Sequence, residues 1–221
     1  MILAIDTSLG TSAALVDGQG RALGEAWSDD PLAHAEVIGG LLQEVLAAGP
    51  PPTHVAAGMG PGPFTGLRIG ITAARTFAQA RALPLVPVPS HDAIALERLA
   101  GAPGRASLEA PAGGSAAASA PFAIVTDARR REFAFSVYDG LDADGLPHRI
   151  AGPVLAHRDE IDERLRALGA LRVDATVVSA AALGVVAARA IAASRELSGT
   201  EPLYLRAPDV TVPAAPKRVG S

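Results

Sequence analysis

One glycine- and proline-rich turn constrains the fold of this chain more than any other segment. Residues 60–70 read Gly-Pro-Gly-Pro-Phe-Thr-Gly-Leu-Arg-Ile-Gly, directly after a short apolar run at 55–59 and directly before a helical run. Glycines let the backbone approach another surface closely, and a helix N-terminus presents unpaired amides to an anion or a partner group. The segment therefore predicts a strand-to-helix turn in an α/β protein, marked by Gly60, Gly62 and Gly66.

The rest of the chain alternates apolar strands with amphipathic helices. It opens with a strand that ends at Asp6, a polar turn and a second strand, and the same order returns at 122–140 around Asp127. Strands and helices alternate after each hairpin, which predicts the α/β class with mixed sheets. Two halves that each open with a β-hairpin suit the two-lobed actin-like ATPase (ASKHA) fold, although periodicity alone does not single that fold out.

An abrupt change of composition divides the chain. Residues 101–120 consist mostly of Gly, Ala, Pro and Ser and offer little to bury. Such a stretch is typical of a linker or a surface loop. We therefore expect an N-terminal lobe at 1–100, which carries the helices for dimerisation, and a smaller C-terminal lobe with an extended tail at 121–221.

Charge and composition exclude several classes of function. The net charge of -4 and the isoelectric point near 5.7 argue against a large nucleic-acid surface, which is normally basic. Because cysteine is absent, disulfides, a thiol nucleophile and a Cys-based metal site are excluded. The N-terminus has no basic leader region, and no apolar run reaches membrane-spanning length. We expect a cytoplasmic protein without membrane contact.

Four motifs, in this order, resemble the TsaB (YeaZ) family. They are the opening Ile-Asp-Thr-Ser at 5–8, the turn at 60–70, the Asp-Ala-Arg hairpin at 127–132 and the Pro-Leu-Tyr-Leu-Arg segment at 202–206. The resemblance covers most of the chain, except 101–120. It implies an actin-like fold and the role of a non-catalytic scaffold subunit in the synthesis of threonylcarbamoyladenosine in tRNA. It also implies that the chain is a paralogue of the catalytic subunit, TsaD.

The comparison with TsaD also shows a departure. In TsaD, the strand after the glycine-rich turn leads into an Asn-His-x-x-x-His segment whose histidines hold a metal. Alignment of that strand with 84–88 places Pro89, Ser90 and Ile94 at these positions, and Ile94 cannot coordinate a metal. The five histidines form no pair at metal-binding spacing, and neither a His-Glu-x-x-His motif nor a Gly-x-Ser-x-Gly elbow is present. We therefore expect no metal site and no catalytic site: an accessory subunit rather than an enzyme, and neither a metallopeptidase nor a serine hydrolase.

The two N-terminal helices are the expected partner surface. In the family these helices are expected to pair with their equivalents on TsaD, or on a second copy when TsaD is absent. The glycines Gly39 and Gly40 weaken the first helix, which close approach of another helix would explain. For most apolar residues of these helices, packing on the sheet is the alternative. The candidate interface residues are Val37, Leu41, Leu42, Val45, Arg68, Ile71, Arg75 and Phe77. The resemblance further implies a TsaE-like ATPase as partner and only indirect contact with tRNA.

The first hairpin turn is a candidate nucleotide site. Asp6, Thr7, Ser8 and Gly10 occupy the position of a first phosphate loop in actin-like ATPases. Alternatively, the Asp6 carboxylate ends the strand and the hydroxyls satisfy turn amides. The second half has no clear adenosine loop, so we expect no cofactor of its own and leave ATP or ADP to the interface shared in the complex. The alternative function is an independent actin-like phosphotransferase or ATPase that uses Asp6 and Asp127.

Three consecutive arginines, Arg129 to Arg131, mark the second hairpin turn. We interpret them as a solvated, charged surface, because a hairpin tip usually faces water. A contact with RNA or with phosphate is the alternative.

Overall fold

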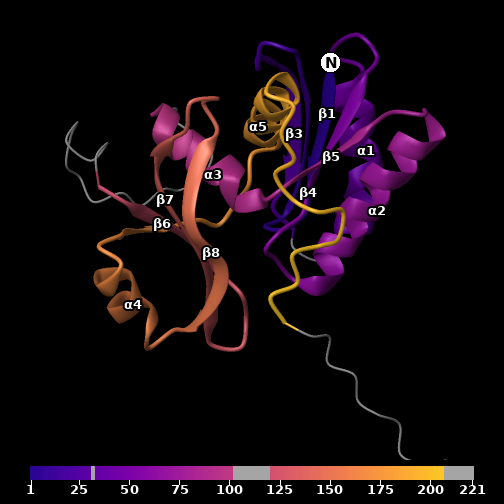
Figure 1. Ribbon diagram of the computed structural model, residues 1–221. Helices are drawn as coiled ribbons and strands as arrows, with labels where there is room; N and C mark the ends of the chain where they lie inside the picture. The colour runs from indigo at the N-terminus through magenta and orange to yellow at the C-terminus, as the bar shows by residue number, and fades with distance from the viewer. Residues whose placement is uncertain (31–32, 102–119, 207–221) are drawn as a thin grey trace, which may run out of the picture.

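The computed structural model describes residues 1–30, 33–101 and 120–206, which form two sheets flanked by helices (Figure 1). The first sheet has five strands in the order β3-β2-β1-β4-β5. Its strands are β1 (Ile2–Asp6), β2 (Thr11–Val16), β3 (Ala22–Ser28), β4 (His54–Gly58) and β5 (Leu85–Val88). Three helices belong to this half of the chain: α1 (His34–Leu46), α2 (Phe64–Ala80) and α3 (Ser90–Ala100).

The second sheet has four strands in the order β8-β7-β6-β9. Its strands are β6 (Phe122–Asp127), β7 (Glu132–Leu141), β8 (Pro147–His157) and β9 (Leu171–Asp174). Two helices follow β8 in sequence, α4 (Ile161–Ala167) and α5 (Ala180–Ala192). Strand β8 was not expected from the sequence.

Both sheets are mixed and both open with a β-hairpin. Strands β1 and β2 pair antiparallel, whereas β1 pairs parallel with β4 and β4 pairs parallel with β5. In the second sheet β6, β7 and β8 pair antiparallel in sequence, and β9 joins β6 in parallel. The predicted class, α/β with mixed sheets that each begin with a hairpin, is therefore confirmed.

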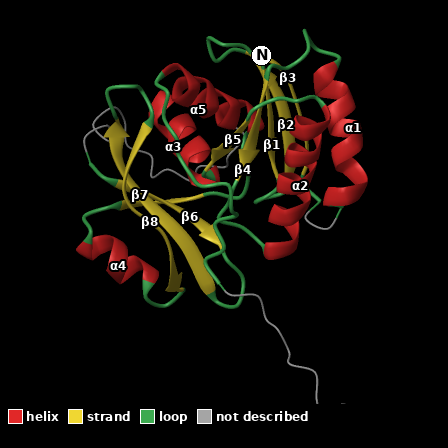
Figure 2. Cartoon of the chain, turned by 45° about the vertical axis from the view of Figure 1, so that its right-hand side comes forward, coloured by secondary structure: helices red, strands yellow, loops and turns green. Residues whose placement is uncertain are grey.

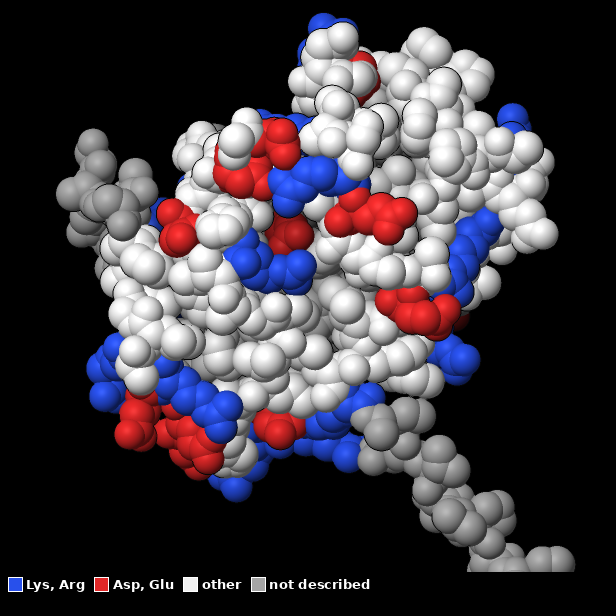
Figure 3. All heavy atoms as spheres, in the orientation of Figure 1, with Lys and Arg blue, Asp and Glu red and all other residues white. Residues whose placement is uncertain are grey.

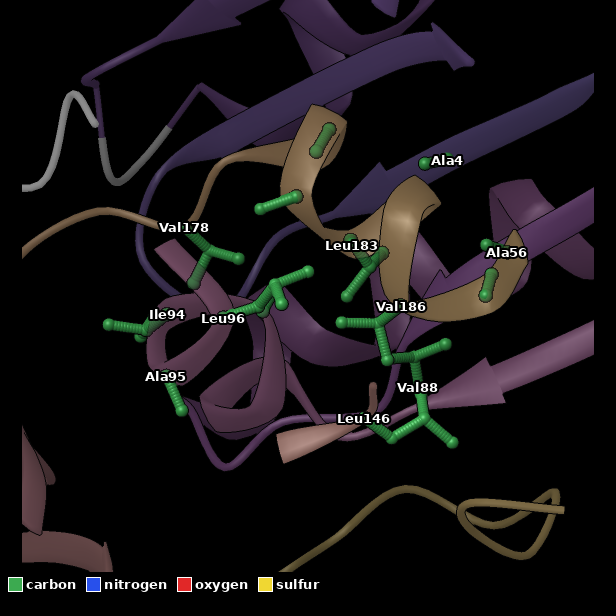
Figure 4. Close-up of a cluster of buried hydrophobic side chains, with 14 of the residues drawn as sticks. Ala4, Ala56, Val88, Ile94, Ala95, Leu96, Leu146, Val178, Leu183 and Val186 are labelled. Atoms are coloured by element: carbon green, nitrogen blue, oxygen red, sulfur yellow. The ribbon is translucent and has the colours of Figure 1, made fainter. Parts of the chain in front are cut away.

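Helices cover both faces of the first sheet. Helices α1 and α2 lie on one face and α5 lies on the other (Figure 2). The apolar side of α5 packs against β1, β4 and α3 through residues such as Leu183 and Val186 (Figure 4). At Gly184 the helix comes so close to the sheet that an added Cβ would lie 2.5 Å from a methyl carbon of Val16. The second half of the chain thus contributes a helix to the core of the first sheet.

Helix α3 joins the two sheets through a buried histidine. His91 is 1% exposed, and its Nδ1 and Nε2 lie 2.9 Å and 3.0 Å from the hydroxyl oxygens of Ser136 on β7 and Thr126 on β6. Burial, with a smaller effect of the Arg149 charge, lowers the pKa of His91 to about 3. The ring is therefore neutral at physiological pH and fixes α3 against the second sheet.

The lobe boundaries expected at 1–100 and 121–221 stay a prediction, and most of the expected linker, 102–119, lies outside the described residues. The C-terminal segment returns to the first half, because the amide of Leu203 donates a 2.8 Å hydrogen bond to the carbonyl of Met59. Within the described part of the chain, every helix is too short or too polar to span a lipid bilayer.

Candidate functional site

The glycine-rich turn closes over the first hairpin of the chain itself. The Thr7 hydroxyl donates a 2.7 Å hydrogen bond to the carbonyl of Gly66 and accepts one of 3.2 Å from the amide of Gly70. An added Cβ would lie 2.2 Å from this hydroxyl at Gly70, and 2.8 Å from the Cα of Ser8 at Gly62. The surface that these glycines allow the backbone to approach is therefore the Thr7–Ser8 turn.

Asp6 lies in the same turn, and its carboxylate is buried and makes structural hydrogen bonds. Its Oδ1 accepts hydrogen bonds from the Ser8 amide at 2.7 Å and from the Ser8 hydroxyl at 2.5 Å, and its Oδ2 accepts one from the Ser90 hydroxyl. Burial raises the pKa of Asp6, while the hydrogen bonds from Ser8 and Ser90 oppose that shift. Gly58 is required beside it, because an added Cβ there would lie 1.8 Å from Oδ2. Asp6 thus stabilises its own turn through Ser8 and links this turn to the start of α3 through Ser90.

A cavity of about 890 Å³ lies between the first hairpin, the start of α2 and the segment before α5. Of the four candidate nucleotide-binding residues, Ser8 and Gly10 line this cavity. Asp6 and Thr7 do not line it, because both are buried and their side-chain oxygens are committed to backbone and hydroxyl partners. The structure therefore brings half of the predicted set to the cavity.

Several cavity residues had not been singled out from the sequence. His34 at the start of α1 has its Nδ1 2.7 Å from the hydroxyl oxygen of Thr11. On the opposite side, Oε1 of Glu25 accepts hydrogen bonds from the Ser179 hydroxyl at 2.8 Å and from the Ala181 amide at 3.0 Å, at the N-terminus of α5. No short motif marks these residues, because they come from four separate segments of the chain.

Asp127, the second carboxylate proposed for an ATPase, also lines the cavity. It accepts hydrogen bonds from the Arg129 amide at 2.8 Å and from the Arg158 guanidinium at 2.9 Å. Partial burial would raise its pKa, but these two hydrogen bonds prevail and hold the pKa below its ordinary value. Asp127 is therefore ionised and paired, and among the described residues no three His, Cys, Asp or Glu side chains are grouped as metal ligands.

The positions aligned with the metal-binding histidines of TsaD lie inside the protein. Ile94 is fully buried in the core between α3 and α5. The Ser90 hydroxyl contacts Asp6 and accepts a 3.1 Å hydrogen bond from the amide of Gly60. His91, one residue off this register, has both ring nitrogens occupied by hydroxyl groups.

The candidate interface residues on α1 and α2 separate into two groups. Val45 and Ile71 are 1% and 2% exposed and pack in the core of the first sheet. For these two residues the alternative, packing on the sheet, describes the structure, because the central residues of the apolar stripe face the sheet. The other six are at least partly accessible: Val37, Leu41, Leu42, Arg68, Arg75 and Phe77.

Gly39 and Gly40 lie on the exposed side of α1. An added Cβ at either position would have no atom within 4 Å. Packing within the described chain therefore gives no reason for two glycines in the middle of a helix, where each costs roughly 1 kcal/mol relative to alanine.

The three arginines of the second hairpin have an unusual backbone. Arg129, Arg130 and Arg131 all have a left-handed conformation, with φ of 65°, 52° and 63°. A left-handed residue other than glycine costs roughly 1–2 kcal/mol. The Asp127 carboxylate, which binds the Arg129 amide, stabilises this turn and so projects three guanidinium groups from one short segment.

Comparison with known proteins identifies a matching family and several similar proteins. Residues 32–144, about half of the chain, match the family model described as "TsaD: tRNA N6-adenosine threonylcarbamoyltransferase". An uncharacterized protein of Mycobacterium tuberculosis (strain H37Rv) is 33% identical over 168 residues, 73% of this chain and 67% of that protein. An uncharacterized protein of Mycobacterium leprae is 32% identical over 171 residues, and the chain spans only 40% of its length.

Two solved structures from Pseudomonas aeruginosa share the fold. A crystal structure described as having similarity to peptidase YEAZ superposes with a TM-score of 0.70 at 24% identity, over 93% of this chain and 99% of the other. The structure of YeaZ superposes with a TM-score of 0.67 at 24% identity, over 92% and 99%. The expected actin-like fold and the resemblance to YeaZ, drawn from four sequence motifs, are confirmed.

Proposed function

This chain belongs to the TsaD family, and from that premise we propose that it is a TsaB-type accessory subunit. In this role it pairs with a TsaD-like catalytic subunit in the cytoplasm and supports the transfer of a threonylcarbamoyl group to adenosine in tRNA. It performs no transfer chemistry itself and meets tRNA only through the complex, which also engages a TsaE-like ATPase. ATP or ADP, where present, belongs to the interface shared with the catalytic subunit.

The observation that carries this proposal is the position of Ser90 and Ile94. At the two places where the catalytic relative has metal-binding histidines, this chain has one side chain packed in the core and one engaged with Asp6. Neither presents a ligand to the cavity. Because Ser90 and Ile94 make structural contacts instead of offering metal ligands, they support an assembly role rather than a catalytic one.

The outer face of α1 and α2 supports a partner surface. Val37, Leu41, Leu42 and Phe77 are half-buried, so each leaves apolar surface in solvent. Arg68 and Arg75 are exposed on α2. Gly39 and Gly40 leave open space above α1, and small residues let two helix backbones approach closely. The same face serves a homodimer when the catalytic subunit is absent.

A mixing experiment tests this assignment. The purified chain is combined with the TsaD-like subunit of the same organism, and the mass of the complex is measured by light scattering after size-exclusion. We expect a one-to-one heterodimer that replaces a homodimer. A Gly40→Lys variant should fold but fail to pair, since the added side chain has room in the monomer and would occupy the space needed by a partner helix.

Gly18→Lys is the matched control, because a side chain there also meets no atom within 4 Å and lies on a different surface. This variant should pair normally. Two proteins that elute separately, with and without ATP and the TsaE-like ATPase, would refute the scaffold role. Tight binding of Mg-ATP and its turnover by the isolated chain would instead support the independent ATPase.

A further inference from the structure

A second groove, which we call the Tyr204 groove, lies between the glycine-rich turn, the β6–β7 hairpin and the last described residues. Its volume is about 390 Å³, within the range of cavities that hold small organic molecules. It shares only Pro63, Asp127 and Arg129 with the larger cavity. The accessory role proposed above assigns no task to this groove.

One wall of the groove is aromatic. The rings of Phe64 and Tyr204 lie 4.7 Å apart between centroids at an interplanar angle of 34°, and the Arg68 guanidinium lies 4.8 Å above the Phe64 ring. The two residues are 38% and 37% exposed, although this chain has few aromatic residues. A paired but solvent-accessible ring surface of this kind is what a flat heteroaromatic group stacks on.

Basic side chains also line the groove. Arg129, Arg130 and Arg206 line the groove, whereas Asp127 is its only lining carboxylate among the described residues and is already bonded to Arg158. On the face shown in Figure 3, basic side chains, with acidic ones among them, lie along the lower edge of the molecule, beside the last described residues. The strained left-handed backbone of the hairpin directs several guanidinium groups to this region, and strained turns of this kind concentrate at binding sites.

Aromatic rings suit a flat base and guanidinium groups suit a phosphate, so the lining of this groove indicates the class of ligand. We propose that the Tyr204 groove binds a nucleoside phosphate, either free or as one unit of a single-stranded RNA. The base would stack on Tyr204 and Phe64, and the phosphate would pair with Arg129 and Arg130. Arg206, held by its ion pair with Glu132, would close the end of the groove near the phosphate.

Calorimetric titration of the full chain tests this site with defined probes: AMP, ATP, adenosine, inorganic phosphate and a single-stranded RNA tetranucleotide. AMP should bind more tightly than adenosine or phosphate alone, because both the aromatic rings and the arginines contribute to its affinity. Tyr204→Leu should weaken binding by about tenfold or more through loss of stacking, whereas Tyr204→Phe should retain it. Circular dichroism of each variant establishes that it is folded.

Trp27→Leu is the matched control, since Trp27 is an exposed aromatic residue that lines the larger cavity and not the Tyr204 groove. Binding that survives Tyr204→Leu, that is lost in Trp27→Leu, or that is absent for every probe at millimolar concentration would overturn the proposal. Equal affinity for AMP and the tetranucleotide would identify free nucleotide as the ligand, and much tighter binding of the tetranucleotide would identify RNA. Assembly with the TsaD-like subunit is measured separately and does not depend on this result.

Discussion

The hydroxyl of Ser90 donates a hydrogen bond to the carboxylate of Asp6, 84 residues earlier in the chain. The same hydroxyl accepts a hydrogen bond from the amide of Gly60. The first hairpin, the glycine-rich turn and the start of α3 therefore meet at one buried carboxylate. Asp6 and Thr7, two of the four candidate nucleotide-binding residues, are thus engaged in contacts inside the first half of the chain.

Replacement of Ser90 by alanine should destabilise the protein. The substitution leaves one Asp6 oxygen and the Gly60 amide buried with one partner fewer, which costs about 1–3 kcal/mol. Urea denaturation followed by circular dichroism measures the loss. Thr76→Ala, an exposed change on α2, serves as the control with little effect. Equal stability of the two variants would show that the Ser90 contact is dispensable.

Glu97 should make the protein less stable as the pH rises. Burial, together with the nearby charge of Glu25, raises the pKa of Glu97 from 4.5 to about 7. Between these values the folded state holds a proton that the unfolded state has released, so the free energy of unfolding falls as pH increases through this window. Glu97→Gln should stabilise the protein by up to about 3 kcal/mol at pH 8 and much less at pH 4. A stability gain independent of pH would contradict this assignment.

His91 should have the opposite effect and make the protein less stable as the pH falls. Its pKa of about 3 in the folded protein lies below the ordinary value of 6.5, so the unfolded state takes up a proton first as the pH falls. The stability that the neutral ring provides is complete above pH 6.5 and is lost progressively toward pH 3. In an NMR titration the ring signals of His91 should stay constant between pH 8 and pH 5. A midpoint near the ordinary histidine value would show that the ring is solvated.

Two glycines in helices should respond oppositely to alanine. At Gly184 the new methyl group would collide with Val16, so Gly184→Ala should destabilise the protein by about 1–3 kcal/mol despite its better helix propensity. Gly40 has open space around it, so Gly40→Ala should stabilise the monomer by up to about 1 kcal/mol. The stabilities of the two variants are compared by thermal unfolding at a protein concentration low enough to avoid dimers. Stabilisation of both variants would mean that α5 does not sit closely on the first sheet.

The hairpins and most helices could be predicted because their signals are local. Apolar runs ended by Asp mark β1 and β6, and the glycine-rich turn marks the start of α2. Strand β8 escaped prediction because Gly152 and Pro153 interrupt it. Its position at the edge of the sheet tolerates a proline, since one side of its backbone needs no ladder partner.

The placement of α5 and of the cavity residues depends on long-range contacts. No local signal in the sequence predicts that α5 packs on the sheet of the other half of the chain. His34, Glu25 and Ser179 come together only through the fold. The roles of Asp6 and Thr7 were likewise open in the sequence, and the close approach at Gly58 and Gly70 is what assigns them to packing.

The central claim, an accessory role in tRNA modification, is tested most directly by the threonylcarbamoyladenosine content of tRNA. In a strain depleted of this chain, mass spectrometry of digested tRNA should show a marked fall in this nucleoside. Expression of the intact chain or of Gly18→Lys should restore it, and Gly40→Lys should not. A normal level of the modification after depletion would contradict the account.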